Sequence, residues 1–299
     1  MTNDSRLPSA RPAWAAATTI LLVLVAACAP AVPSASPGAS AGPTAPPSPT
    51  ASPVIEGIQH PTGATDVVLR VESGGGFAPI ESNATAAPSF TLYGDGTIVF
   101  RDPTAPPPVE VANVRRLSPF LTIRLDEEGI QALLEDAIGR GGIGVGAGPY
   151  IAGADMETTT FTITADGRTK AVSVSGLAPD LHPGNAAIVA SLAGLYERLG
   201  AFAGAVAGEQ IYVPVAYRGV LLSVDQPFGP VVGWPWADIE PAEFVGGENE
   251  LFKLRTMTPG EIGVLGIPGI EGGFQGLTLQ NGAKLYSFQL RPLLPDETK

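Results

Sequence analysis

Short runs in which hydrophobic and polar positions alternate predict that β-strands dominate this chain. The run VVLRV after Asp66 is rich in β-branched residues, and two later strand-like runs are interrupted by Asp95-Gly96 and by Asp166-Gly167. Asp-Gly between strand-forming residues is a strong hairpin signal, because a two-residue type I′ turn needs positive φ at both central positions. We therefore predict a strand near residue 67 and a hairpin at each Asp-Gly pair.

The two hairpins are expected to expose their faces differently. In the first, over residues 89–101, pairing Gly94 with Thr97 leaves apolar side chains on both faces, which indicates a partly covered strand pair. In the second, pairing Ile163 with Lys170 gathers apolar side chains on one face and threonines on the other. The repeated aspartates are interpreted as hairpin corners, because a third turn at Asn281-Gly282 uses a neutral residue in the same place.

Two segments have the spacing of an amphipathic helix. The first follows Asp126, a suitable N-cap, and its apolar stripe is Ile130, Leu133, Leu134, Ala137 and Ile138. The second covers about residues 184–199, with Ile188, Leu192, Leu195 and Leu199 on its stripe. The order strand, hairpin, helix, hairpin, helix predicts an α+β fold, with an antiparallel sheet built from Asp/Asn-Gly hairpins and two helices on one face.

After about residue 206 the chain is again strand-like, which predicts a smaller β-rich C-terminal unit that either stands alone or completes the first sheet. Pro214 interrupts the run IYVPVAYRGVLLSV and indicates an edge strand or a bulge. Thr258 and Glu261 form a capping box, which predicts a short helix.

The first 54 residues have another pattern. Arg6 and Arg11 precede an apolar run too short for a stable membrane span, the layout of a secretory signal. Its end, Val25-Ala26-Ala27-Cys28, resembles the lipobox of bacterial lipoproteins, which implies cleavage before Cys28 and acylation of that cysteine, including palmitate-type chains. Residues 29–54 are almost entirely Ala, Pro, Ser, Thr and Gly, which indicates a disordered tether.

These patterns divide the chain into four predicted parts. They are a signal peptide over residues 1–27, the lipidated cysteine and tether over 28–54, an α+β domain over 55–205 and the β-rich unit over 206–299.

Composition narrows the possible partners. The net charge of −12 and the lack of any basic cluster larger than Arg115-Arg116 argue against nucleic acid, which is bound through clustered cations. Because Cys28 is the only cysteine of the chain, an intramolecular disulfide framework is excluded. The fold must therefore be stabilised by its core.

Few residues suggest chemistry. The two histidines, His60 and His182, are isolated, and no G-x-S-x-G nucleophile elbow is present. The G-x-G-x-x-G match at residues 139–144 follows a predicted helix instead of a strand, so we interpret it as a connector. We expect no catalytic residues, no metal site and no cofactor, and the sequence leans against an enzyme.

The best candidate for a binding surface combines tryptophans with carboxylates. Trp234, Trp236, Glu243 and Glu248 form the one neighbourhood of this kind in the sequence. Aromatic rings beside carboxylates can bind sugars, and two carboxylates could hydrolyse a glycosidic bond. Alternatively, the Trp-Pro-Trp segment packs the two units together.

Several phrases together resemble a family of uncharacterised secreted lipoproteins from high-GC bacteria. They are VVLRVE before a glycine-rich break, FTLYGDGTI, RLDEEGIQALLEDA, the second hairpin, the WPW segment and LRPLLPDE. The resemblance covers nearly the whole chain after the tether and implies fold and location, but it carries no activity and no catalytic residues. Trp236 departs from the aliphatic residue that the resemblance leads us to expect.

Our leading hypothesis from the sequence is a membrane-anchored, extracytoplasmic lipoprotein, bound to the membrane through acyl chains on Cys28. Its domain is expected to bind a protein, a peptide or a cell-envelope component without catalysis. One alternative is an envelope hydrolase that uses carboxylates near Trp234 and Trp236. Another is an inhibitor or folding accessory that acts through an exposed sheet edge near Pro214.

Overall fold

A computed structural model describes residues 57–78, 80–106, 108–110, 114–202, 208–227, 229–246 and 252–298. The chain divides into one unit over Met1–Val54 and one over Ile55–Lys299. All described residues belong to the second unit. The predicted signal peptide and tether, the predicted lipidation site Cys28 and the candidate binding residue Glu248 lie outside the described residues.

Eight strands form the first sheet, in the order β6-β8-β7-β1-β2-β3-β5-β9. Their bounds are β1 Val67–Gly74, β2 Phe90–Tyr93, β3 Thr97–Phe100, β5 Leu121–Arg124, β6 Tyr150–Ile151, β7 Thr158–Ala165, β8 Arg168–Ser175 and β9 Gln210–Ile211. Neighbouring strands are antiparallel except for the short β6, which runs parallel to β8.

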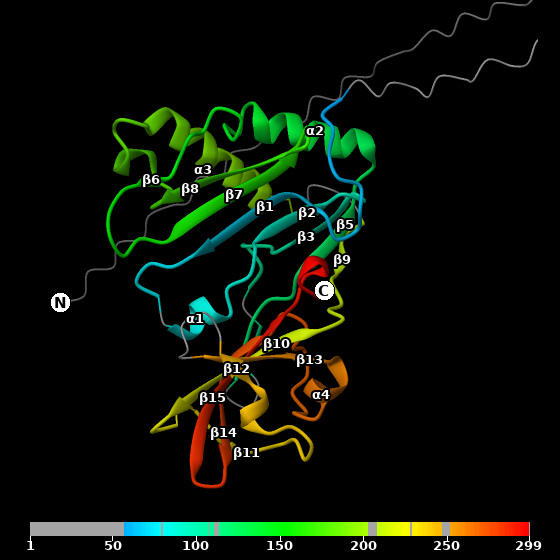
Figure 1. Cartoon of the computed structure of the whole chain (residues 1–299), viewed down its shortest axis with the longest axis vertical. Helices are drawn as coiled ribbons and strands as arrows, with labels where there is room; N and C mark the ends of the chain where they lie inside the picture. The colour runs from blue at the N-terminus through cyan, green and yellow to red at the C-terminus, as the bar shows by residue number, and fades with distance from the viewer. Residues whose placement is uncertain are drawn as a thin grey trace, which may run out of the picture. The chain divides into compact units, whose positions relative to one another are not determined.

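Two helices, α2 (Glu127–Ile138) and α3 (Ala186–Gly200), cover one face of this sheet (Figure 1). The Asp126 side chain accepts a hydrogen bond from Gly129 N at 2.9 Å, which confirms the predicted N-cap of α2. Inward side chains of the strands and the apolar stripes of both helices form one core, which includes Leu69, Val71, Phe90, Leu92, Phe161, Val172, Ile130, Leu134, Val189, Leu192 and Leu195. The predicted α+β fold is therefore confirmed.

A second sheet follows the order β11-β14-β15-β10-β13-β12, and β4 also pairs with β14. Its strands are β4 Arg115–Arg116, β10 Tyr217–Val224, β11 Val231–Gly233, β12 Val245–Gly246, β13 Lys253–Met257, β14 Phe274–Asn281 and β15 Lys284–Pro292. All pairs are antiparallel except β11 with β14. Aromatic residues dominate its core, among them Tyr217, Trp236, Phe244, Phe274 and Phe288.

Shorter helices complete the described part of the chain. They are α1 (Ile80–Ala84), α4 (Pro259–Gly263) and the 3₁₀ turns η1 (Pro179–Leu181), η2 (Pro241–Glu243) and η3 (Pro295–Thr298). The predicted capping box of α4 is present, since Thr258 Oγ1 accepts from Glu261 N and the Glu261 side chain accepts from Thr258 N at 2.6 Å.

The two sheets exchange short strands along the sequence. β9 comes after residue 206 but extends the first sheet through β5, while β4 comes before it and pairs with β14 of the second sheet. Pro214 lies in the connection between β9 and β10, where no ladder hydrogen bond from its nitrogen is required. The chain therefore passes from one sheet to the other at the proline that was expected to mark an edge or a bulge.

The second hairpin has the predicted geometry. Ile163 pairs with Lys170, and both turn residues, Asp166 and Gly167, have positive φ of 50° and 69°. This is the conformation that a two-residue type I′ turn requires.

The other two turns differ from the prediction by one residue. In the first hairpin Leu92 pairs with Ile98, β2 ends at Tyr93 and β3 begins at Thr97, so three residues form the loop. Positive φ falls on Gly96 but not on Asp95. At the third turn Asn281 pairs with Lys284, so the loop starts at Gly282, whose φ is 58°. A glycine at the first central position is typical of a type II′ turn.

The C-terminal segment of the described chain fastens the second sheet to the first. Arg291 in β15 forms a bidentate pair with Glu297, at 2.8 Å and 2.6 Å. The neighbouring Asp296 accepts hydrogen bonds from Arg70 of β1 and from the Tyr93 hydroxyl of β2, both at 2.7 Å.

Candidate ligand-binding site

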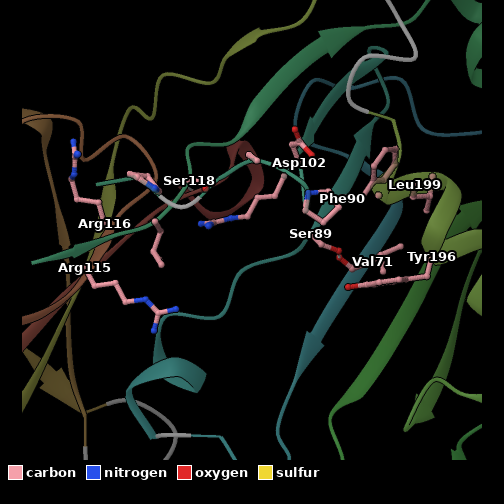
Figure 2. Close-up of a pocket in the computed structure, with 15 residues that line it drawn as sticks. Val71, Ser89, Phe90, Asp102, Arg115, Arg116, Ser118, Tyr196 and Leu199 are labelled. Atoms are coloured by element: carbon pink, nitrogen blue, oxygen red, sulfur yellow. Dashed lines mark hydrogen bonds between the residues drawn. The ribbon is translucent and has the colours of Figure 1, made fainter. Parts of the chain in front are cut away.

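A cavity of about 380 Å³ lies where the two sheets and helix α3 meet (Figure 2). Its lining comes from β1, from the start of β2, from residues 101–105 and 108, from residues 115–118 and from the C-terminal turn of α3. This volume falls in the range of about 300–1,000 Å³ that is usual for small-molecule sites.

The cavity has an apolar side. Val71, Phe90 and Leu199 belong to the core of the first sheet, and they lie together with Tyr196 on one side of the cavity in Figure 2. Phe202 packs against this core, with its ring 5.6 Å from that of Phe90 in an edge-on arrangement. These side chains are held by packing, so the apolar surface exists before any ligand arrives.

The opposite side carries cations. Arg115, Arg116 and Ser118 lie there, and they are separated from the apolar group by the open space of the cavity in Figure 2. Both arginines belong to β4, so the strand that joins the second sheet brings them to a cavity walled by the first.

Arg101, at the end of β3, is the most enclosed of the lining cations. Its guanidinium donates to Gly272 O at 3.2 Å and lies over the Phe120 ring, 4.2 Å from the centroid. It forms no ion pair with any described residue. Burial and the nearby charge of Arg291 lower the pKa of Arg101 to about 10. Burial has removed water from this charged guanidinium. An anion that binds beside it is therefore favoured, because it stabilises the charge that water no longer solvates.

The two arginines of β4 differ in what they contact. Arg116 donates to Val109 O at 2.6 Å and to Pro268 O at 3.0 Å, and so it fastens two loops at the rim. Arg115 is exposed, and no described residue forms a hydrogen bond or an ion pair with its side chain. Arg115 is therefore available to a ligand.

One carboxylate belongs to the same lining. Asp102 Oδ1 accepts hydrogen bonds from Thr104 N at 2.8 Å and from Thr104 Oγ1 at 2.7 Å, and these bonds lower the pKa of Asp102. The lining thus carries three arginines against one aspartate, in a chain whose net charge is −12.

This arrangement is suited to binding. Its described lining contains no histidine or cysteine, and the Ser89 hydroxyl donates to Val71 O at 3.2 Å. An activated nucleophile needs a base within hydrogen-bond reach, and the described residues of this cavity do not supply such a pair.

The predicted tryptophan–carboxylate surface is not assembled as expected. Trp236 is only 7% exposed and belongs to the core of the second sheet. Its indole N–H donates to Glu261 O at 2.8 Å, and that of Trp234 donates to Ile239 O at 2.6 Å. The two rings contact each other edge-on at 5.1 Å. The Trp-Pro-Trp segment thus packs within the second sheet.

Glu243, the third residue of that expected surface, has a structural role. Its Oε1 accepts from Glu240 N at 2.8 Å, and its Oε2 lies 3.8 Å from Arg255 Nε. Glu248 lies outside the described residues. The hydrolytic alternative near Trp234 stays a prediction.

The two histidines hold loops. The buried His182 ring contacts the carbonyl oxygens of Ser175 and Gly176 at 3.1 Å and 3.0 Å through Nε2. His60 contacts Pro61 O at 2.7 Å and Glu127 at 3.2 Å. In the described part of the chain no three His, Cys, Asp or Glu residues are grouped as a metal site.

The segment around Pro214 bears on the sheet-edge hypothesis. It continues the edge strand β9, and Ile211, Val213 and Val215 are all more than half exposed. The apolar run is in the right place for a partner strand, and the hypothesis stays a prediction.

Sequence reasoning missed the cavity because its residues are far apart along the chain. The Arg115-Arg116 doublet was visible only as a basic patch too small for nucleic acid. No local sequence signal indicates that β4 pairs with β14 of the second sheet. This pairing brings the two arginines to the same cavity as Phe90 and Leu199.

Comparisons with known proteins do not identify the site. No protein-family model matches this chain, and neither the curated proteins nor the solved structures give a significant match. Among the described helices, none is long and apolar enough to cross a membrane.

Proposed function

We propose that this protein is a lipid-anchored, extracytoplasmic binding protein of the cell envelope. The observation that carries the binding role is the cavity, in which a preformed apolar wall faces arginines that have no carboxylate partner among the described residues. The lipobox-like sequence ending at Cys28, the tether and the resemblance to secreted lipoproteins support the location.

The proposed anchor follows from simple energetics. Each CH₂ group buried in lipid contributes about 0.8 kcal/mol, so a single acyl chain binds marginally, whereas the two or three chains expected on a lipoprotein cysteine bind stably. A proline-rich tether extends by about 3.1 Å per residue, so residues 29–54 reach about 80 Å at full extension. The binding unit could therefore work at a distance from the membrane that holds it.

Metabolic labelling with a palmitate analogue tests the anchor. Wild-type protein should incorporate the label and sediment with membranes, while Cys28→Ser should lose the label and appear in the soluble extracytoplasmic fraction. Because Cys28 is the only cysteine, thioester labelling elsewhere cannot produce a false signal. A wild-type protein that stays unlabelled, or that is found in the cytoplasm, would contradict the proposal.

A further inference from the structure

We propose that the cavity binds a monoanionic amphiphile, a carboxylate with an aliphatic or aromatic body. The carboxylate faces Arg115 and Arg101, and the body lies against Val71, Phe90, Leu199 and Tyr196. This inference rests on the proposed binding function and specifies the class of ligand.

The apolar wall determines the body of the ligand. Val71, Phe90 and Leu199 line the cavity and are at most 3% exposed, so a ligand body would contact the few apolar atoms that these core side chains present there. The Tyr196 ring extends this surface toward solvent, and its hydroxyl points toward the Arg115 side in Figure 2. Burial of apolar ligand surface here favours binding in proportion to the area removed from water, against the entropy lost on association.

The arginines determine the sign of the head group. Arg115 has no described partner, and Arg101 has a carbonyl and an aromatic ring but no counter-charge among the described residues. A guanidinium presents a planar set of donors that matches a carboxylate with two parallel hydrogen bonds. Arg116 contributes charge while its donors remain on Val109 and Pro268.

Asp102 influences how many negative charges the ligand can carry. Its lowered pKa keeps this carboxylate ionised at neutral pH, and it lines the same cavity as the arginines. Each negative charge on the ligand is repelled by this carboxylate, so a dianion is repelled twice as strongly as a monoanion. Because the donors of Arg116 are already bound to Val109 and Pro268, a second negative charge also finds fewer free donors, and the proposed site favours a carboxylate over a dianionic phosphate monoester.

The binding experiment uses the full chain carrying Cys28→Ser, so that no acyl chain of the protein competes for the cavity. Calorimetry at neutral pH compares dodecanoate with dodecanol and with dodecyl phosphate. We expect dodecanoate to bind, the alcohol to bind at least about tenfold more weakly because it lacks the charge-assisted hydrogen bonds, and the phosphate to fall between them.

Variants separate the head from the body. Arg115→Gln should weaken dodecanoate about tenfold and leave dodecanol unchanged, whereas Tyr196→Ala should weaken both. Arg124→Gln is the matched control, because Arg124 is also exposed but lies in β5 and pairs with Asp95 instead of lining the cavity. It should bind both ligands as the parent does.

The outcomes are decisive. Absence of dodecanoate binding, or equal affinity in Arg115→Gln and Arg124→Gln, would overturn the ligand assignment. Tighter binding of dodecyl phosphate than of dodecanoate would overturn the monoanion preference. If Cys28 is still labelled with palmitate, either result would contradict the proposed ligand class but not the proposed lipid-anchored binding protein. If dodecanoate binds but Cys28 of the wild-type protein is not labelled with palmitate, the proposed lipid anchor would be contradicted instead.

Discussion

Asp95 and Asp166 occupy matching positions in two similar sequence phrases, yet they have different roles in the fold. Asp95 Oδ1 accepts from Thr97 N at 3.0 Å, while the positive φ of that turn falls on the next residue. Asp166 itself has positive φ, and it also contacts the segment that precedes β1: its N–H donates to Gln59 O at 2.7 Å, and its Oδ1 accepts from Gln59 N at 3.1 Å. Asp166 thus fastens its turn to the segment before β1 by hydrogen bonds, whereas Asp95 reaches only the exposed Arg124 of the neighbouring strand β5, with Oδ2 3.5 Å from Nη2.

Substitution of Asp166 tests this distinction. Asp166→Ala should lower the free energy of unfolding by about 1–2 kcal/mol, because it removes the side-chain acceptor and places a Cβ-bearing residue without a local hydrogen bond at positive φ. Asp166→Asn should be nearly silent, since asparagine tolerates this conformation and retains Oδ1. Urea unfolding measures both, with Asp95→Asn as a control expected within about 0.5 kcal/mol. Equal damage from Asp166→Asn and Asp166→Ala would show that the charge matters more than the geometry.

Two turn glycines form a second matched pair. Gly96 and Gly167 both have positive φ, but a Cβ on Gly96 would collide with Leu125 O, whereas a Cβ on Gly167 would meet open space. Gly167→Ala should therefore lower the free energy of unfolding by about 1 kcal/mol, because only the positive φ opposes the new side chain. Gly96→Ala should lower it by clearly more, because the collision with Leu125 O adds to that cost. Thermal and urea unfolding should rank the two variants in this order, and the reverse order would contradict the proposed packing of the first hairpin.

At the scale of elements, helix α2 holds the chain where the folded unit begins. Gln131 accepts from Ile58 N at 2.8 Å and donates to Ile58 O at 2.9 Å, so one side chain satisfies both backbone groups of Ile58, as a neighbouring strand would. His60 adds a contact to Glu127 one turn earlier. The segment that follows the predicted tether is thus fixed to the helix.

Gln131→Ala should release this segment. We expect a loss of about 1–2 kcal/mol in unfolding free energy, from two hydrogen bonds that involve partly buried groups, and faster hydrogen exchange at the Ile58 amide. Glu135→Ala in the same helix changes an exposed side chain and should stay within about 0.5 kcal/mol. An unchanged hydrogen-exchange rate at the Ile58 amide in Gln131→Ala would show that the Gln131 side chain does not hold this segment.

The same elements show what sequence patterns can and cannot predict. Asp126 and the capping box at Thr258 are local signals, because each helix end is satisfied by side chains three residues away, and both were predicted. The register of the first hairpin was wrong because Gly94 has a tertiary role: a Cβ there would collide with Pro61 O. The pattern Gly-Asp-Gly offers two possible corners, and packing against residues 61–63 selects between them. The cavity is non-local in the same sense, since Arg101 and Arg115 line one cavity only because β4 pairs with the second sheet.

At the scale of the whole folded unit, the carboxylates of η3 connect the sheets through a partly buried ionic network. Burial acts to raise the pKa of Asp296, but the hydrogen bonds from Arg70 and Tyr93 outweigh it, so the pKa lies below its usual value. The pKa of Glu297 is lowered in the same way, with burial opposed by the bonds from Arg291. Burial and the bond to Asp296 also raise the pKa of the Tyr93 hydroxyl, which therefore remains a donor at neutral pH.

This network predicts a loss of stability in acid. Because the folded pKa of Asp296 lies below its unfolded value of about 3.9, the stabilisation is complete above that pH and disappears as the pH falls through the folded pKa. Urea unfolding from about pH 5 to pH 2 should show a falling free energy, with a shallower fall in Asp296→Asn, which should also be less stable at pH 7. Asp225→Asn, at an exposed position with no described partner, should follow the wild type. If the unfolding free energies of Asp296→Asn and the wild type fall in parallel as the pH is lowered, protonation of Asp296 is not the cause of the acid instability.

The position of β15 also has a consequence for the order in which the molecule can be assembled. β15 lies between β14 and β10 in the second sheet, and the segment just after it supplies the contacts of Asp296 to β1 and β2. A polypeptide that emerges N-terminal end first cannot close this sheet, or join it to the other, until residues near 298 have appeared. Such sequence-distant pairing is slow, because loop entropy is lost before contacts compensate. If the protein crosses a membrane as an unfolded chain, as the proposed location requires, we expect the second sheet to close only after its last strand has crossed.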